Sequence, residues 1–158
     1  QVRRQLLAQL DDEHFAILSG STDSELMFAL ALQCGLRDNP REGIARMVGL
    51  VEQAGREAGI EYPVQMTLGF SNGEDLHAVR YSSEGKSRSL FHSNDLAALE
   101  AHLEPEQKAL LDRMGKHARA IVSEPLSDLE DFWEPIPESS FITIRDGDVA
   151  VEPFRPLV

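Results

Sequence analysis

The sequence predicts an α+β domain in which helices accompany a mainly antiparallel sheet. Helical spacing of apolar residues dominates the chain up to Ala58. Alternation of apolar and polar residues then runs from Val64 to Phe70 and leads into Asn72-Gly73, a strong hairpin signal. A second hairpin signal, Asp146-Gly147, lies between two apolar runs near the end. Because hairpins pair neighbouring strands in opposite directions, the sheet is expected to be antiparallel.

The composition fits a single globular domain with an acidic surface. The 158 residues include 15 Lys and Arg against 27 Asp and Glu, a formal net charge of −12, and 42% are hydrophobic. Nucleic acid is not an expected partner, because Arg3-Arg4 is the only adjacent basic pair. No apolar run approaches the roughly 20 residues of a membrane helix, and no signal-peptide pattern opens the sequence. The single cysteine, Cys34, excludes an intrachain disulfide, so the cytoplasm is the expected compartment.

Helical periodicity predicts several helices. Val2–Leu10 is expected to form a short helix, and the apolar residues Phe15, Ile17 and Leu18 follow it. Arg41–Ala58 is expected to be amphipathic. Its predicted buried side is Ile44, Met47, Val48, Val51 and Ala58, and its predicted solvent side is Arg46, Glu52, Gln53, Arg56 and Glu57. The segment 95–111 contains Pro105 and is expected to form two shorter helices.

The helix that begins near Thr22 is the most informative element. Thr22 and Glu25 have the spacing of a capping box, and Asp23 lies in the first turn, where exposed N–H groups favour negative charge. The next seven residues, 26–32, are apolar on every side. We therefore expect this helix to be enclosed between other layers, with its acidic start at an edge or cleft.

The remaining segments are predicted to be strands and loops. Leu76–Tyr81 is the expected return strand of the first hairpin, and further strands are expected at Ser89–His92 and Ala118–Val122. Phe141–Ile144 and Val149–Val151 are expected to form the terminal hairpin. The segments 123–128 and 133–137 are predicted to be a loop and an irregular apolar turn, respectively.

Asp23 is the first candidate for a functional side chain. A carboxylate held at a helix start can bind the ammonium group of a ligand. From the sequence alone, the favoured alternative is that Asp23 only complements the helix dipole. Cys34 is expected to be a buried, inert thiol, because nothing near it in the sequence would lower its pKa. The histidines His14, His77, His92, His102 and His117 show no metal-ligand spacing. From the residues alone, no nucleophile and no metal site are predicted.

Several motifs resemble the class II glutamine amidotransferases, a family of N-terminal-nucleophile hydrolases. They are Gly20-Ser21-Thr22-Asp23-Ser24-Glu25, Phe70-Ser71-Asn72-Gly73, Leu76–Ser82, Ser89–Ser93, Val122–Leu126 and Trp133–Pro137. The similarity is greatest to the stand-alone branch that cleaves γ-glutamyl bonds. It covers most of the chain, with 96–115 the least similar part.

The resemblance implies a four-layer αββα sandwich and a cysteine-based reaction. In this family an N-terminal cysteine attacks the γ-amide of glutamine or a γ-glutamyl compound, and water then hydrolyses the thioester. The acidic residue of the Thr-Asp-Ser-Glu motif binds the substrate ammonium, a role that falls on Asp23, with Thr22 beside it as a secondary substrate-binding candidate. Gln1 stands first instead of cysteine. Residues 1–158 therefore resemble the C-terminal portion of one such domain, without its nucleophile half.

Two hypotheses follow from the resemblance. In the first, the chain forms part of an amidohydrolase, and the N-terminal half of the same domain supplies the nucleophile. In the second, it is a non-catalytic subunit that binds a partner or a γ-glutamyl metabolite. Neither implies a metal or organic cofactor. A fragment of such a sandwich is expected to expose sheet edges and to favour association into oligomers.

Overall fold

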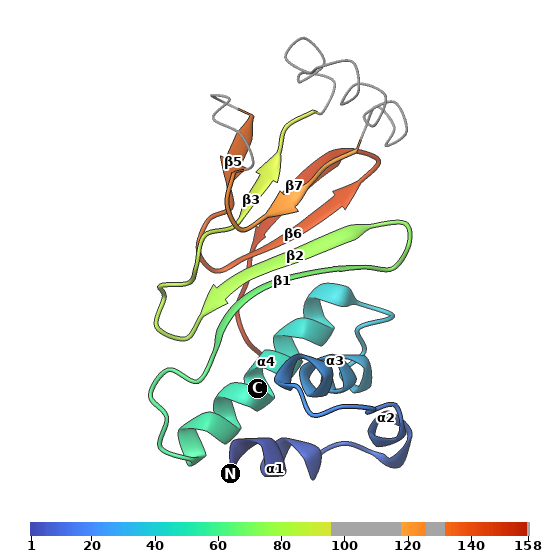
Figure 1. Cartoon of the computed structure of the whole chain (residues 1–158), viewed down its shortest axis with the longest axis vertical. Coiled ribbons are helices and arrows are strands. Elements are labelled where there is room, and N and C mark those ends of the chain that lie inside the picture. Colours follow the sequence, from blue (N-terminus) through green and yellow to red (C-terminus); the bar gives the residue numbers. More distant parts are fainter. Residues whose placement is uncertain (96–117, 126–131, 158) are drawn as a thin grey trace. The chain divides into compact units, whose positions relative to one another are not determined.

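The computed structural model describes residues 1–95, 118–125 and 132–157, with helices first and strands after them. The chain divides into two units. One consists of Gln1–Gln65, Ser82–Lys86 and the stretch from Phe154, and the other of Met66–Tyr81 and Ser87–Pro153. Figure 1 shows the helices of the first unit and the strands, most of which lie in the second. An α+β class with antiparallel pairing is therefore confirmed.

Four helices lie in the described residues: α1 (Val2–Leu7), α2 (Asp12–Ala16), α3 (Asp23–Gln33) and α4 (Pro40–Glu57). The first ends earlier than predicted, and α2 was not predicted as a helix. Asp11 caps α2 by accepting the His14 N–H, and the apolar Phe15 within this helix remains exposed. A polar cap thus defines α2, which is why a search for apolar spacing does not find it.

Enclosure of α3 on all sides was expected and is wrong for one face. Leu26, Ala29, Leu30 and Ala31 are buried, but Phe28 remains 54% exposed. The continuous apolar run therefore does not mean continuous burial here. Helices α1, α3 and α4 contact one another and bury the side of α3 that carries Leu26 and Leu30.

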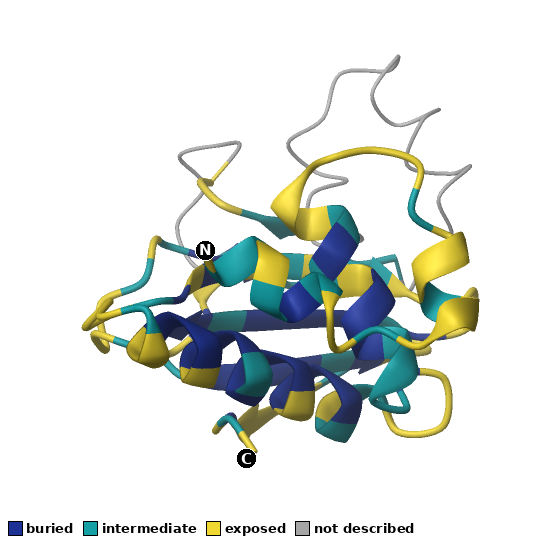
Figure 2. Ribbon diagram, turned by 90° about the horizontal axis from the view of Figure 1, so that it is seen from below, coloured by how far each residue is buried: buried dark blue, intermediate teal, exposed yellow. Residues whose placement is uncertain are grey.

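Helix α4 is the long amphipathic helix that the spacing predicts. It begins with the Asn39 cap and Pro40, and Gly59 follows it with a φ of +83°. In Figure 2 the helices carry both buried and exposed residues along their length. The prediction that Glu52 faces water is wrong, since Glu52 is only 4% exposed. Its Oε1 accepts a hydrogen bond from Ser83 Oγ at 2.6 Å, and its Oε2 pairs with Arg56.

The corner between α3 and α4 is closely packed. A Cβ atom on Gly43 would lie 2.6 Å from the backbone N and Cα of Leu36. Only a residue without a side chain fits this helix position, because backbone atoms cannot move aside as a flexible side chain can.

The strands of the described residues form two antiparallel sheets. They are β1 (Gln65–Ser71), β2 (Leu76–Ser82), β3 (Phe91–Ser93), β4 (Ile121–Val122), β5 (Trp133–Pro135), β6 (Ser140–Arg145) and β7 (Asp148–Pro153). One sheet has the order β1-β2-β6-β7 and the other the order β4-β3-β5. Both predicted hairpins are present, with positive φ at Gly73, Asp146 and Gly147. The segment 133–137 was predicted to be an irregular turn, but Trp133–Pro135 pairs with β3 as a strand.

The second unit has a core to which both sheets contribute. Ala78, Ile142 and Ile144 from the larger sheet pack with Leu90, beside β3, and Ile136, beside β5. Ile121 of β4 packs against the same cluster. The predicted helices of segment 95–111 lie almost wholly outside the described residues, as do His102 and His117.

Candidate functional site

The start of α3 is built by a side-chain cap. Thr22 is the N-cap, and its Oγ1 accepts the Glu25 N–H at 3.3 Å. Asp23 is the first helical residue, and its Oδ1 accepts the Ser24 N–H at 2.9 Å. The hydroxyl of Thr22 is thus used to cap the helix, while the exposed Asp23 carboxylate keeps its second oxygen available.

Glu25 completes the turn in a way that the capping-box spacing did not predict. Its carboxylate reaches beyond Thr22 and accepts the backbone N–H groups of Ser19 at 2.6 Å and Gly20 at 2.9 Å. The hydrogen bond from Ser19, followed by that from Gly20, lowers the pKa of Glu25 below its ordinary value. Glu25 is therefore an ionised structural group that shapes the loop before α3.

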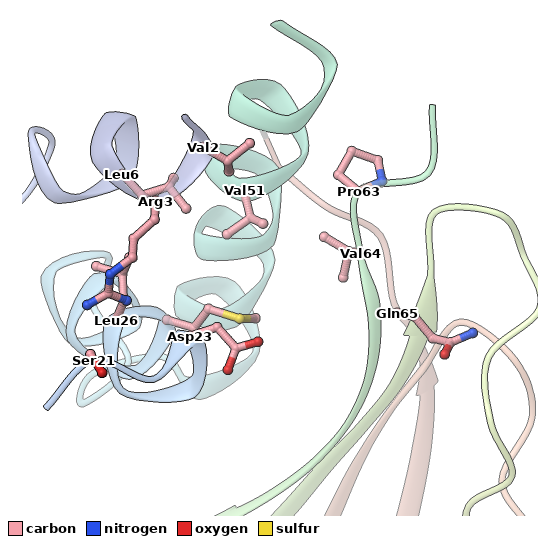
Figure 3. Close-up of a pocket in the computed structure, with 11 residues that line it drawn as sticks. Val2, Arg3, Leu6, Ser21, Asp23, Leu26, Val51, Pro63, Val64 and Gln65 are labelled. Carbon is pink, nitrogen blue, oxygen red and sulfur yellow. The ribbon is translucent and has the colours of Figure 1, made fainter. Parts of the chain in front are cut away.

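A cavity of about 310 Å³ lies beside this helix start, within the first unit. Its walls come from α1, α3, α4 and the segment that leads into β1 (Figure 3). The lining residues are Val2, Arg3, Leu6, Ser21, Asp23, Leu26, Met27, Val51, Pro63, Val64 and Gln65. Most of the wall is apolar, and Asp23 is the only carboxylate among the residues that line it. The predicted site residue therefore borders a space that can hold a small molecule.

Arg3 provides the opposite charge in the same cavity. Its Nη1 donates a hydrogen bond to the Thr22 carbonyl oxygen at 3.1 Å. In Figure 3 the Asp23 carboxylate points away from the Arg3 guanidinium. Within the described part of the chain, no ion pair joins the two groups. In the sequence Arg3 is notable only as part of a basic pair, although its spacing from Leu6 puts both residues on one side of a helix.

The segment 63–65 forms the wall of this cavity that lies opposite the helices. The Val64 N–H donates to Ser83 Oγ at 3.1 Å, and that hydroxyl donates to the buried Glu52. A Cβ atom on Gly55 would lie 2.3 Å from Pro63 Cβ, so Pro63 packs directly on α4. The wall is therefore fixed to α4 by both packing and hydrogen bonds.

This arrangement favours binding of an organic cation. A carboxylate that borders a mostly apolar cavity and has no ion-pair partner in the described residues can attract an ammonium group. The cavity lining contains neither a cysteine nor a histidine. The described lining can thus bind and orient a ligand, but it holds no thiol or imidazole that could attack one.

The thiol of Cys34 lies elsewhere. It borders a separate cavity of about 460 Å³ together with Arg46 and Leu157. Burial raises the pKa of the Cys34 thiol, and Arg46 only partly opposes that effect. Cys34 is partly buried and not fully buried as predicted. Its raised pKa agrees with the predicted lack of nucleophilic reactivity.

The described histidines have separate environments. His14 contacts Asp11, His77 lies in β2 with its Nδ1 3.2 Å from Thr143 Oγ1, and His92 lies in β3 near Glu134. Residues 1–95, 118–125 and 132–157 contain no group of three or more side chains suited to a metal ion. Within the same residues, none of the helices has the length and apolar character that crossing a bilayer requires.

The fold is similar to that of a solved glutamine aminotransferase class-II domain protein. A solved structure of a glutamine aminotransferase class-II domain protein from Silicibacter pomeroyi matches with a TM-score of 0.81 at 29% identity. The match covers 99% of this chain and 62% of that one.

Sequence similarity points to the same group of proteins. The probable glutamine amidotransferase DUG3 of Saccharomyces cerevisiae is 24% identical over 172 residues, which cover 96% of this chain and 48% of the yeast protein. The chain therefore spans about half of the curated relative that it matches. No model of a known protein family matches the sequence.

Proposed function

We propose that this chain is the C-terminal part of a class II amidotransferase-like amidohydrolase that cleaves the γ-amide of glutamine or of a γ-glutamyl compound. The missing N-terminal half would supply a cysteine nucleophile and complete a four-layer αββα sandwich. Two observations support the proposal: the similarity to two proteins of this kind, each longer than the chain, and the Asp23 carboxylate beside a cavity.

Asp23 carries the part of the proposal that concerns this chain. Its carboxylate binds the α-ammonium group of the substrate, and the first turn of α3 fixes the position of that contact. The apolar walls of the cavity can pack against the aliphatic part of the substrate beside this contact. A bound substrate is thereby oriented before any bond changes, and this orientation lowers the barrier to attack.

The proposed reaction then proceeds through a thioester. The cysteine sulfur bonds to the γ-carbonyl carbon, the carbon–nitrogen bond breaks, and the departing nitrogen takes the proton that the thiol released. Water adds to the thioester carbonyl, and the carbon–sulfur bond breaks to release glutamate and the thiol. A reducing compartment such as the cytoplasm would keep this thiol available.

Substitution of Asp23 in the complete protein tests the assignment. Asp23→Asn should lower kcat/KM for glutamine or a γ-glutamyl amide by about 100-fold, because the substrate ammonium loses its charged partner. Glutamate release is the measurement. Asp12→Asn is the matched control, because Asp12 also lies in the first turn of a helix but does not line the cavity.

The outcomes separate the two hypotheses on function. Equal activity of the Asp23 and Asp12 variants would contradict the proposed role of Asp23. A complete protein that binds glutamine in calorimetry but releases no glutamate would favour the non-catalytic hypothesis.

A further inference from the structure

We propose that Arg3 is a positioning residue for the Asp23 site: its guanidinium holds the start of α3 where Asp23 can reach the ligand ammonium. This inference rests on the proposed function and deepens it by adding a residue that acts through Asp23. Its basis is the contact between Arg3 Nη1 and the Thr22 carbonyl oxygen, together with the position of Arg3 in the wall of the same cavity.

The segment that leads into α3 is not held by burial. Residues 19–22, which precede α3, are all exposed, so hydrogen bonds rather than burial fix their position. The bonds from Ser19 and Gly20 to Glu25, and from Glu25 to Thr22, lie within the segment and its first helical turn. These local bonds determine the shape of the loop but not its place against the rest of the first unit.

Arg3 supplies a link from another helix. Its bond to Thr22 joins residues 19 positions apart and connects α1 to the N-cap of α3. Leu6, one turn further along α1, is buried and anchors that helix. The Thr22 carbonyl is suited to this link, since its only helical hydrogen bond, from the Leu26 N–H, is long at 3.4 Å.

The charge arrangement keeps Asp23 free for a ligand. A guanidinium paired with Asp23 would compete with an incoming ammonium group, but the described structure directs Arg3 to a neutral carbonyl instead. Arg3 also attracts the nearby Glu25 carboxylate. The guanidinium therefore stabilises the turn without neutralising the group that would bind the ligand.

Three variants test the inference in the complete protein. Arg3→Met removes the donors and keeps much of the aliphatic chain, Arg3→Lys keeps a cationic donor, and Arg4→Met is the control at an exposed position outside the cavity. Arg3→Met should raise the KM for glutamine about tenfold with little change in kcat, because a charged hydrogen bond is lost. The KM of Arg3→Lys should lie between those of Arg3→Met and the unchanged protein, and Arg4→Met should leave the KM unchanged.

A substrate analogue distinguishes positioning from direct binding. Glutaramate has the amide and carboxylate of glutamine but lacks the α-ammonium group. If Arg3 acts through Asp23, Arg3→Met should leave kcat/KM for glutaramate unchanged and should add little to the effect of Asp23→Asn on glutamine. An equal loss with both substrates, or full additivity with Asp23→Asn, would overturn the inference.

Hydrogen exchange gives a readout that needs no substrate. The backbone amides of residues 24–26 should exchange faster in Arg3→Met than in Arg4→Met, because the start of α3 loses its link to α1. Equal exchange in the two variants would overturn the inference even if the proposed function failed. If the complete protein is active and Asp23→Asn impairs it, but Arg3→Met behaves like Arg4→Met, only the role of Arg3 is wrong.

Discussion

Two carboxylates illustrate how differently the two units use charge. Asp23, at the start of α3, is exposed beside a cavity, and none of the ion pairs in the described residues includes it. Asp75, before β2, is 4% exposed and accepts two hydrogen bonds from Arg145, one of them from Nε at 2.6 Å. A paired carboxylate contributes to folding, whereas one left without a cation beside a cavity is available to a ligand.

The substitution with the largest expected effect tests whether the core of the second unit depends on close packing. Ile142→Ala should lower the free energy of unfolding by about 2–5 kcal/mol, because it leaves a cavity between the two sheets. Urea denaturation measures the change. Val151→Ala, at the exposed residue paired with Ile142 across β6 and β7, is the control and should cost less than about 1 kcal/mol. Similar losses in both variants would contradict the assigned core.

The contrast between an exposed carboxylate in the first unit and a buried one in the second is not absolute, because the helical unit also contains the buried carboxylate of Glu52. Glu52→Ala should lower the free energy of unfolding by about 1–3 kcal/mol, since Ser83 and Arg56 lose a buried acceptor. Denaturant unfolding is again the measurement, with exposed Gln53→Ala as the control. If both substitutions cost the same, the buried network does not stabilise α4.

Asp75→Asn sharpens the comparison through its pH dependence. The hydrogen bonds from Arg145 hold the pKa of Asp75 below its ordinary value. The ionised form therefore stabilises the fold above the unfolded-state pKa of about 4, and this contribution is lost as the pH falls through the lower folded-state pKa. Asp75→Asn should lower Tm by several degrees at pH 7 and by progressively less in acid.

Thermal unfolding between pH 2 and pH 7 measures this difference. Asp148→Asn is the control, because it removes an exposed carboxylate from β7, which pairs with β6 and not with β2. A gap in Tm between the Asp75 variant and the unchanged protein that stays constant at every pH would show that the Asp75–Arg145 pair is not its cause.

The smallest expected effect concerns His77, whose ring lies near those of Phe70 and Phe141. Burial lowers the pKa of His77, so on acidification the unfolded chain takes up this proton first. Stability should therefore fall as the pH drops below about 6.5. His77→Phe should flatten this dependence in melting curves between pH 5.5 and pH 7.5, while Thr143→Val keeps the titrating ring and should preserve it. An unchanged slope in His77→Phe would refute the assignment.

Local sequence signals predicted the elements that local interactions determine. Thr22 and Glu25 marked the start of α3, and Asn72-Gly73 and Asp146-Gly147 marked the two hairpins, because each signal depends on neighbouring residues. The strand Trp133–Pro135 was missed because its pairing partner, β3, lies about 40 residues earlier in the chain. Periodicity likewise could not show that Ser83 meets Glu52, 31 residues away, and makes its burial favourable.

The features of the candidate site also differ in whether a local motif predicts them. Asp23 and its helix start were accessible from a short motif, whereas the cavity required four segments to come together. Arg3 reaches Thr22 only after α1 and α3 pack, so composition alone could not assign it a role. Long-range packing, which no local motif encodes, determines which residues accompany Asp23.

The contact at Gly43 also has a consequence for tracing the ancestry of this chain. Since a methyl group there would collide with the main chain of Leu36, substitution should be tolerated only if the whole corner is rebuilt. Distant sequences that keep this corner should therefore share a glycine three residues after the proline that begins α4. That marker would help to align divergent homologues even where other side chains have changed.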